Sequence, residues 1–137
     1  MIATACFCSK TRRASRVLMR LYDEALAGSG LTVTQYGVLR TLARLEAPTL
    51  STLAAATGHD RTAMWRTLQP LIRKGLAVAA AGDRGHAALL ALTADGARLI
   101  GEAEPAWRAA QERVGEALGP DAEALFRALD RVERLAA

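Results

Sequence analysis

The sequence contains few of the residues that carry metal, redox or cofactor chemistry. Its 137 residues include two cysteines, two histidines and four prolines, and only 4% are aromatic. Cys6 and Cys8 are too close together to cross-link a fold, and a reducing compartment would keep them as thiols. A Cys-x-Cys pair supplies only two of the four ligands of a structural zinc ion, and both histidines lie much later in the chain. We therefore expect no metal and no cofactor.

Long hydrophobic runs are also missing. No segment approaches the roughly 18 apolar residues that span a bilayer. The first 13 residues lack the basic start and long apolar stretch of a secretory signal. A Ser/His/Asp arrangement with supporting context, a glycine-rich phosphate loop and an acid-pair motif are absent as well. These absences predict a cytoplasmic protein with no membrane partner that is not an enzyme.

Charge is unevenly distributed along a chain whose length fits one domain, residues 1–137. Of the net charge of +4, residues 1–28 carry +3, residues 31–95 carry +3 and residues 96–137 carry −2. A basic first two-thirds and an acidic last third suit a body that faces phosphate on one side. A generally arginine-rich proteome would give the same balance, so charge alone does not distinguish the two readings.

Hydrophobic periodicity predicts a mainly helical chain with one small β-hairpin. We expect helices over about residues 8–27, 32–44, 50–57, 60–74 and 93–118, and a last helix whose first turn holds Pro120. Thr32 and Gln35 have the spacing of a capping box, and Asp60 is placed to cap the fourth helix. Residues 76–81 and 88–92 flank a Gly-Asp-Arg-Gly-His turn and predict the hairpin. Pro105 is expected to bend or interrupt the fifth helix.

The segment 60–74 has the two faces that a DNA-recognition helix requires. Met64, Leu68, Leu71 and Ile72 fall on one side and are expected to pack inward. The opposite side, the recognition face, has no acidic residue and is rich in groups that bond bases or phosphates; it consists of Arg61, Thr62, Trp65, Arg66, Gln69 and Arg73. Such a stripe is often just a solvated face, but a tryptophan is uncommon on one. Groove entry would bring the N-terminal end, from Arg61 to Arg66, closest to base edges.

Further DNA contacts are expected around this helix. The turn at residues 83–86 would form a wing, with Arg84 inserted into the minor groove and His86 on a phosphate. Thr49 and Ser51, at the start of the third helix, offer hydroxyls and amides to a phosphate. Hydroxyls at a helix start are explained equally well as caps.

These motifs resemble one family. Leu31-Thr32 with Gln35-Tyr36, the segment from Gly58 to Leu76, Asp83-Arg84, and Leu92-Thr93 followed by Gly96 are similar to the multiple antibiotic resistance regulator (MarR) family. The resemblance implies a winged helix-turn-helix at residues 31–95 and a helical dimerisation region at 1–30 and 96–137. It also implies a homodimer that reads a pseudo-palindromic operator in double-stranded DNA, as a transcriptional repressor. Two departures are that Gly85 occupies the usual place of a basic wing residue, and that Trp65 replaces a small hydroxyl residue.

The apolar stripes of the first, fifth and sixth predicted helices favour dimerisation independently of the resemblance, because one subunit offers little else for them to bury against. We read Trp107 and Phe126 as core or interface packing rather than as a ligand site. Family members often bind a small aromatic or phenolic effector between the helical region and the winged lobe. No residue of this sequence identifies such an effector.

The cysteines allow two interpretations. Cys6 and Cys8 lie at a helix start with cationic residues close behind, which stabilises thiolate. Cys8 and Tyr22 have the spacing of residues in hydroperoxide-sensing MarR proteins, although Arg12 stands where those proteins have a second tyrosine. Either these residues form a redox sensor, or the thiols are small apolar groups at a dimer interface. For the whole protein, the alternative to a DNA-binding regulator is a winged helix that serves as a protein-interaction module without specific DNA binding.

Overall fold

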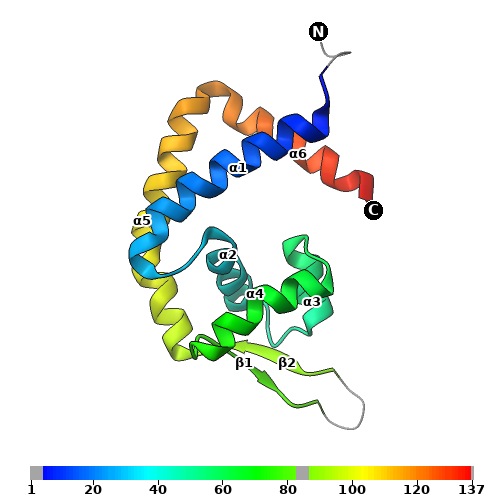
Figure 1. The fold of residues 1–137 in the computed structure, drawn as a ribbon, viewed down its shortest axis with the longest axis vertical. Coiled ribbons are helices and arrows are strands. Elements are labelled where there is room, and N and C mark those ends of the chain that lie inside the picture. Colours follow the sequence, from blue (N-terminus) through cyan, green and yellow to red (C-terminus); the bar gives the residue numbers. More distant parts are fainter. Residues whose placement is uncertain (1–4, 83–86, 137) are drawn as a thin grey trace.

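The computed structural model describes residues 5–82 and 87–136. Its elements, in chain order, are α1 (Phe7–Leu26), η2 (Ala27–Ser29), α2 (Val33–Arg44), α3 (Leu50–Thr57), α4 (Arg61–Arg73), β1 (Ala77–Ala80), β2 (Leu89–Leu92), α5 (Ala94–Leu118), η3 (Gly119–Asp121), α6 (Ala122–Glu133) and η4 (Arg134–Ala136). In Figure 1, α2, α3, α4 and the hairpin form a lower lobe, and α1 and α6 lie above it. The long helix α5 runs along one side and joins the two parts. The predicted class, mainly α with a small hairpin in a winged helix-turn-helix, is confirmed.

The start of α2 follows from its capping residues. Thr32 Oγ1 accepts a hydrogen bond from the Gln35 backbone N–H at 3.1 Å, and Gln35 Oε1 accepts one from the Thr32 N–H at 3.0 Å. This reciprocal pair is the predicted capping box. Asp23 Oδ1 accepts a third bond, from the Val33 N–H at 2.7 Å, and so holds the end of α1 against the start of α2.

One hydrophobic core lies within the lower lobe and against α5. Its fully buried side chains come from α2, α3, α4 and β2, and include Tyr36, Leu39, Leu53, Met64, Leu68, Leu71 and Leu90. Leu26 from α1 and Ala103 from α5 join the same cluster. This core fixes the orientation of α4 within the lobe.

The hairpin is antiparallel and shorter than predicted. Ala77 pairs with Leu92, and Ala80 pairs with Leu89. The Leu90 backbone N–H donates to the Pro48 carbonyl at 2.8 Å, which attaches β2 to the loop before α3.

The structure refines two expectations about proline. The chain remains helical through Pro105, so α5 is not interrupted; it follows a curved path in Figure 1. Pro105 is exposed, and a helix accommodates a missing N–H donor by bending. Pro120 lies in η3, so α6 itself begins two residues later at Ala122.

Candidate nucleic-acid interface

A tight turn joins α3 to α4. Gly58, with φ +74°, ends α3 in the left-handed conformation that glycine adopts without strain. Asp60 then caps α4, with Oδ1 accepting from the Ala63 N–H at 2.7 Å, as predicted. Helix, three-residue turn and helix form a helix-turn-helix, and α2, α3 and α4 pack on one another.

The two faces of α4 separate as the sequence predicts. Met64, Leu68 and Leu71 are fully buried, and Ile72 packs against the same core. On the opposite side, five of the six recognition-face residues are exposed and Gln69 is half-buried. Trp65 retains 39% exposure, which is high for a tryptophan in a folded chain. The helix therefore presents its polar side outward and keeps its apolar side for the fold.

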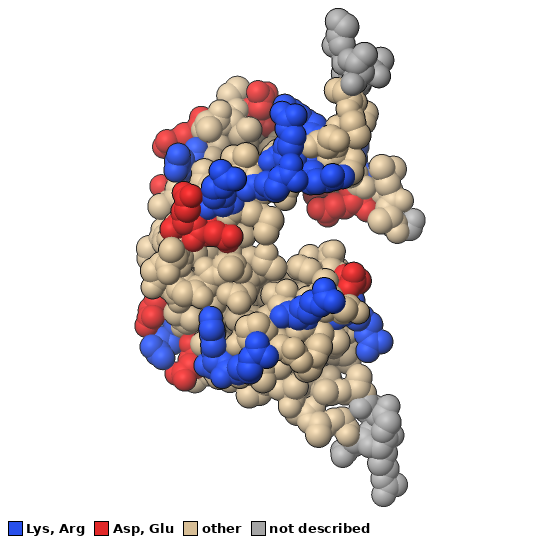
Figure 2. Space-filling model, viewed as in Figure 1, with Lys and Arg blue, Asp and Glu red and all other residues tan. Residues whose placement is uncertain are grey.

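The recognition face is electrostatically one-sided. Arg61, Arg66 and Arg73 lie on a helix that has no acidic residue between its two ends. Within the described ranges, the ion pairs lie on α5 and α6, and none involves α4. In Figure 2, basic side chains lie over the place that α4 occupies in Figure 1. A polyanion would meet little local competition from carboxylates there.

Thr49 and Ser51 have different environments. Thr49 is half-buried and caps α3, accepting from the Thr52 N–H at 3.2 Å. Its hydroxyl is therefore already used within the chain. Ser51 is exposed in the first turn of α3 and is free of such a role among the hydrogen bonds of the described residues.

The wing carries the remaining predicted contacts. Arg84 and His86 fall at 83–86, outside the described residues. The strands that carry this turn are anchored at their base, since Leu90 is buried and β2 bonds to the loop before α3.

The cysteines lie at the exposed start of α1. Cys6 is the N-cap residue, and its Sγ accepts from the Ser9 N–H at 3.5 Å. That backbone hydrogen bond lowers the pKa of the Cys6 thiol below its ordinary value. Cys8, in the first turn, is contacted by Arg12, whose Nη2 donates to Cys8 Sγ at 3.2 Å. Both cysteines are exposed in the single chain.

The structure does not bring Tyr22 to the cysteines within one chain. Cys8 and Tyr22 belong to the same continuous helix, and 14 residues of α-helix span about 21 Å. The Tyr22 hydroxyl is instead hydrogen-bonded to Gln111 Oε1 of α5, and burial raises the pKa of Tyr22. Any approach of Tyr22 to a thiol would need the cysteine of a second chain.

Sequence reasoning missed one cluster that links the lobes. The Tyr36 and Trp107 ring centroids are 5.9 Å apart, and the Arg40 guanidinium lies over both rings. Tyr36 and Arg40 are four residues apart on α2, a spacing that predicts neighbours on one helix face. No sequence signal indicated that Trp107 of α5 would complete the stack.

Two hollows in the surface have mainly apolar linings. One of about 360 Å³ is lined by Val33, Gly37, Val38, Thr41, Thr57 and His59, so it extends from α2 to the turn before α4. The other, of about 450 Å³, is lined by residues of α1, including Leu18, Met19 and Tyr22, by Leu125 and Leu129 of α6, and by Val33 of α2. No group of three or more potential metal ligands occurs in the described parts of the chain. Among the same residues, no helix is both long and apolar enough to cross a bilayer.

Comparison with known proteins identifies the family. A model described as the MarR family matches residues 29–85. The transcriptional regulator MosR of M. tuberculosis shares 36% identity, with 97% of this chain and 96% of that chain covered and a TM-score of 0.85. The chain belongs to the MarR family. It is accordingly a DNA-binding transcriptional regulator.

Other solved MarR-type structures agree with this fold. MosR in complex with DNA gives a TM-score of 0.88 at 36% identity, with 96% of each chain covered. A MarR-family regulator from Rhodococcus sp. RHA1 gives a TM-score of 0.75 at 24% identity, covering 97% of this chain and 98% of that one. A search of curated protein sequences gives no match. The proteins similar to this MarR-family chain are regulators rather than enzymes.

Proposed function

We propose that this MarR-family protein represses transcription as a homodimer that binds a pseudo-palindromic operator through the recognition face of α4. The observation that carries the proposal is the outward orientation of Arg61, Trp65 and Arg66 over a fully buried apolar side. Arg61, Thr62, Trp65 and Arg66 would contact base edges in the groove, and Gln69 and Arg73 would hold phosphates. Ser51 and the wing residues Arg84 and His86 would add backbone and minor-groove contacts.

The homodimer is supported by the apolar surface of the helical region. Val17 and Met19 of α1 and Phe126 and Val132 of α6 are all exposed, by 44–64% of their surface. Large apolar side chains left exposed on two neighbouring helices indicate a surface that a partner covers. A second copy of this chain is the partner proposed, because two-fold symmetry would present two α4 helices to successive major grooves.

The first test is binding to DNA fragments of the source genome, followed by sequencing of the retained fragments. A common motif with two-fold symmetry supports the proposal. Affinity for the best fragment should fall steeply as salt rises, because several phosphates are neutralised on binding. Salt-independent binding, or no retained motif, would favour a protein-interaction module instead.

The second test separates the recognition face from charge in general. Arg66→Ala should weaken binding to the selected duplex by about 1–3 kcal/mol. Arg113→Ala, which removes an exposed arginine from α5, serves as the matched control and should leave affinity near wild type, provided both variants elute as dimers. Equal affinities for Arg66→Ala and wild type would show that α4 does not read the groove.

A small-molecule effector is the second element of the proposal. Similar structures include BpsR, whose DNA binding is regulated by 6-hydroxynicotinic acid, and CouR bound to p-coumaroyl-CoA. In this chain the hollow of about 360 Å³ touches His59, in the turn that sets the position of α4. A planar aromatic ligand there would shift α4 if it preferred the displaced turn. The test is operator release by 6-hydroxynicotinate and p-coumarate in wild type and in His59→Ala.

Oxidation of the Cys8 thiol is the alternative switch of operator binding. Cys8 is exposed, and the Arg12 guanidinium lies 3.2 Å from its Sγ, so a peroxide that reaches this thiol would meet a hydrogen-bond donor beside it. Tyr22 would take part only through the second chain of the dimer. The test measures operator affinity of wild type and Cys8→Ser before and after treatment with mild hydroperoxide. If the affinity of wild type does not change with the oxidant, the switch is ruled out. As a regulator of transcription, the protein would act in the cytoplasm without catalysing a reaction.

A further inference from the structure

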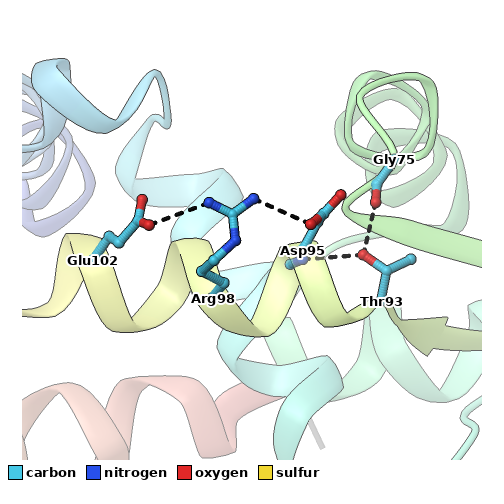
Figure 3. A network of polar contacts seen from close by, with 6 residues as sticks. Gly75, Thr93, Asp95, Arg98 and Glu102 are labelled. Carbon is cyan, nitrogen blue, oxygen red and sulfur yellow. Dashed lines mark hydrogen bonds and ion pairs between the residues drawn. The ribbon is translucent and has the colours of Figure 1, made fainter.

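One hydroxyl joins the end of the recognition helix to the start of the long helix. Thr93 Oγ1 donates to the Gly75 carbonyl at 2.7 Å and accepts from the Gly96 N–H at 3.0 Å. Gly75 follows Lys74, the C-cap residue of α4, while Thr93 is the N-cap residue of α5. The Thr93 N–H also donates to the Leu76 carbonyl at 3.1 Å. Figure 3 shows the hydroxyl between the two elements.

A glycine makes this close approach possible. A Cβ added at Gly96 would lie 2.2 Å from the Leu76 carbonyl oxygen and 2.7 Å from Leu92 Cδ1. The first obstacle is backbone, which cannot rotate away as a flexible side chain would. The first turn of α5 therefore rests directly on the Leu76–Ala77 peptide, which lies between the end of α4 and the start of β1. Thr93 and Gly96 together define this contact, which we call the α4–α5 junction.

The charged residues beside the junction contribute little to it. Arg98 pairs with Asp95 at 3.1 Å and with Glu102 at 3.3 Å, but all three side chains are more than half exposed and belong to α5. Exposed pairs within one helix stabilise that helix weakly and do not reach α4. At the junction, the side-chain contact that joins the residues after α4 to the start of α5 is therefore the Thr93 hydroxyl, beside the close approach at Gly96.

We propose that Thr93 is a positioning residue that sets which spacing between operator half-sites the protein accepts. This inference rests on the proposed function, in which α5 belongs to the dimer scaffold and α4 to the DNA reader. If the junction fixes α4 on α5, it also fixes the separation of the two α4 helices in the dimer. One base pair inserted between half-sites moves the second by about 3.4 Å and rotates it by roughly 35°, so a rigid pair of readers rejects it.

Three substitutions distinguish the two hydrogen bonds of the Thr93 hydroxyl, the one to the Gly75 carbonyl and the one that caps α5. Thr93→Ser keeps the hydroxyl and both of its hydrogen bonds. Thr93→Asp keeps a side chain that caps α5, but a carboxylate has no proton to donate to the Gly75 carbonyl. Thr93→Val keeps the shape and loses both bonds. If Thr93→Val fails to form a folded dimer, Thr93→Asp still decides the question, because its helix start is preserved.

The main readout is affinity for the selected duplex carrying zero, one or two extra base pairs between half-sites. For wild type and Thr93→Ser, affinity for the duplex should fall about tenfold or more with each inserted base pair. For Thr93→Asp and Thr93→Val, affinity should fall less than about threefold with each inserted base pair. Both variants should still prefer the selected half-site sequence. If Thr93→Asp loses affinity with each inserted base pair as steeply as wild type does, the inference is overturned. That result would show that the hydroxyl only caps α5.

A measurement without DNA keeps this result separate from the failure of the proposed function. Spin labels at Thr62→Cys, in a Cys6→Ser/Cys8→Ser background, report the distance between the two α4 helices of the dimer. The distribution of distances between the labels should be narrow for the chain with Thr93 and for Thr93→Ser. It should be broader or shifted for Thr93→Asp. Identical distributions in all three overturn the inference whether or not an operator has been found.

Discussion

The guanidinium carbon of Arg40 lies 4.4 Å from the ring centroid of Trp107, which attaches α2 of the lower lobe to the middle of α5. Tyr36 contacts both partners, with its ring 5.9 Å from Trp107 and 5.7 Å from Arg40. The stack stands at the opposite end of the lobe's contact with α5 from the Thr93 junction. The orientation of the lobe on the long helix is therefore held at two separate points.

Removing charge from this stack should have a measurable cost. Arg40→Met keeps an apolar stem over the rings but loses the cation–π interaction, and should lower the free energy of unfolding by about 0.5–1 kcal/mol. Arg44→Met, one turn further along α2, is the matched control and should stay within about 0.5 kcal/mol of wild type. Urea unfolding at one fixed protein concentration provides the measurement. Equal losses for the two variants would show that the stack adds nothing specific.

Substitutions of two adjacent residues of α4 should affect different properties, one the stability of the fold and the other DNA binding. Met64→Ala removes a fully buried side chain and should destabilise the fold by about 2–5 kcal/mol. Trp65→Ala should leave stability nearly unchanged but weaken operator binding by about 1–3 kcal/mol. Thermal unfolding and a binding titration on the same preparations check both. A Trp65→Ala variant that binds the operator like wild type would contradict the assignment of Trp65 to the interface.

The capping box at the start of α2 should be worth more than an ordinary surface contact. Thr32→Ala leaves the Gln35 N–H without its acceptor and should cost about 1 kcal/mol of unfolding free energy. Thr32→Ser retains the acceptor and should recover most of that loss. Failure of serine to recover stability would mean that the threonine methyl group, rather than the cap, is responsible.

Thiol reactivity at the start of α1 should depend on pH through Cys6. Because the Ser9 N–H bond lowers the Cys6 pKa, thiolate forms at lower pH in the folded chain than in the unfolded chain. Ser9→Pro removes that N–H in the first helical turn, where proline is tolerated, and should move the pH profile of iodoacetamide alkylation to higher pH. The comparison is made in a Cys8→Ser background. An unmoved profile would show that the amide does not control the thiol.

Local chemistry allowed most of the elements to be predicted. Thr32 with Gln35, Asp60 and Gly58 are strong signals, and the structure confirms all of them. The side chains of the first three bond free N–H groups at a helix start, and Gly58 ends α3 by adopting the left-handed backbone conformation. The alternation of Met64, Leu68 and Leu71 with the recognition face likewise predicted which side of α4 is buried. Such features depend on residues within a few positions of each other.

Features that depend on distant residues were harder to predict. Nothing near Trp107 in the sequence indicated that Arg40 would lie over it, and the bond from Tyr22 to Gln111 crosses 89 positions. Thr93 was predicted as the start of a helix, and Gly96 entered only through the family resemblance. Their contacts with Gly75 and Leu76 emerge when the hairpin folds the chain back. Residue spacing placed Cys8 and Tyr22 in one pattern, yet a straight helix keeps them apart.

The exposed apolar side chains of α1 and α6 have a consequence for the living cell. If two copies must meet before either α1 or α6 is fully covered, the active species grows with the square of the free subunit concentration when subunits are scarce. A modest dilution at cell division would then release an operator more sharply than it lowers the protein level. Expression of the regulator itself would set the threshold at which its target genes respond.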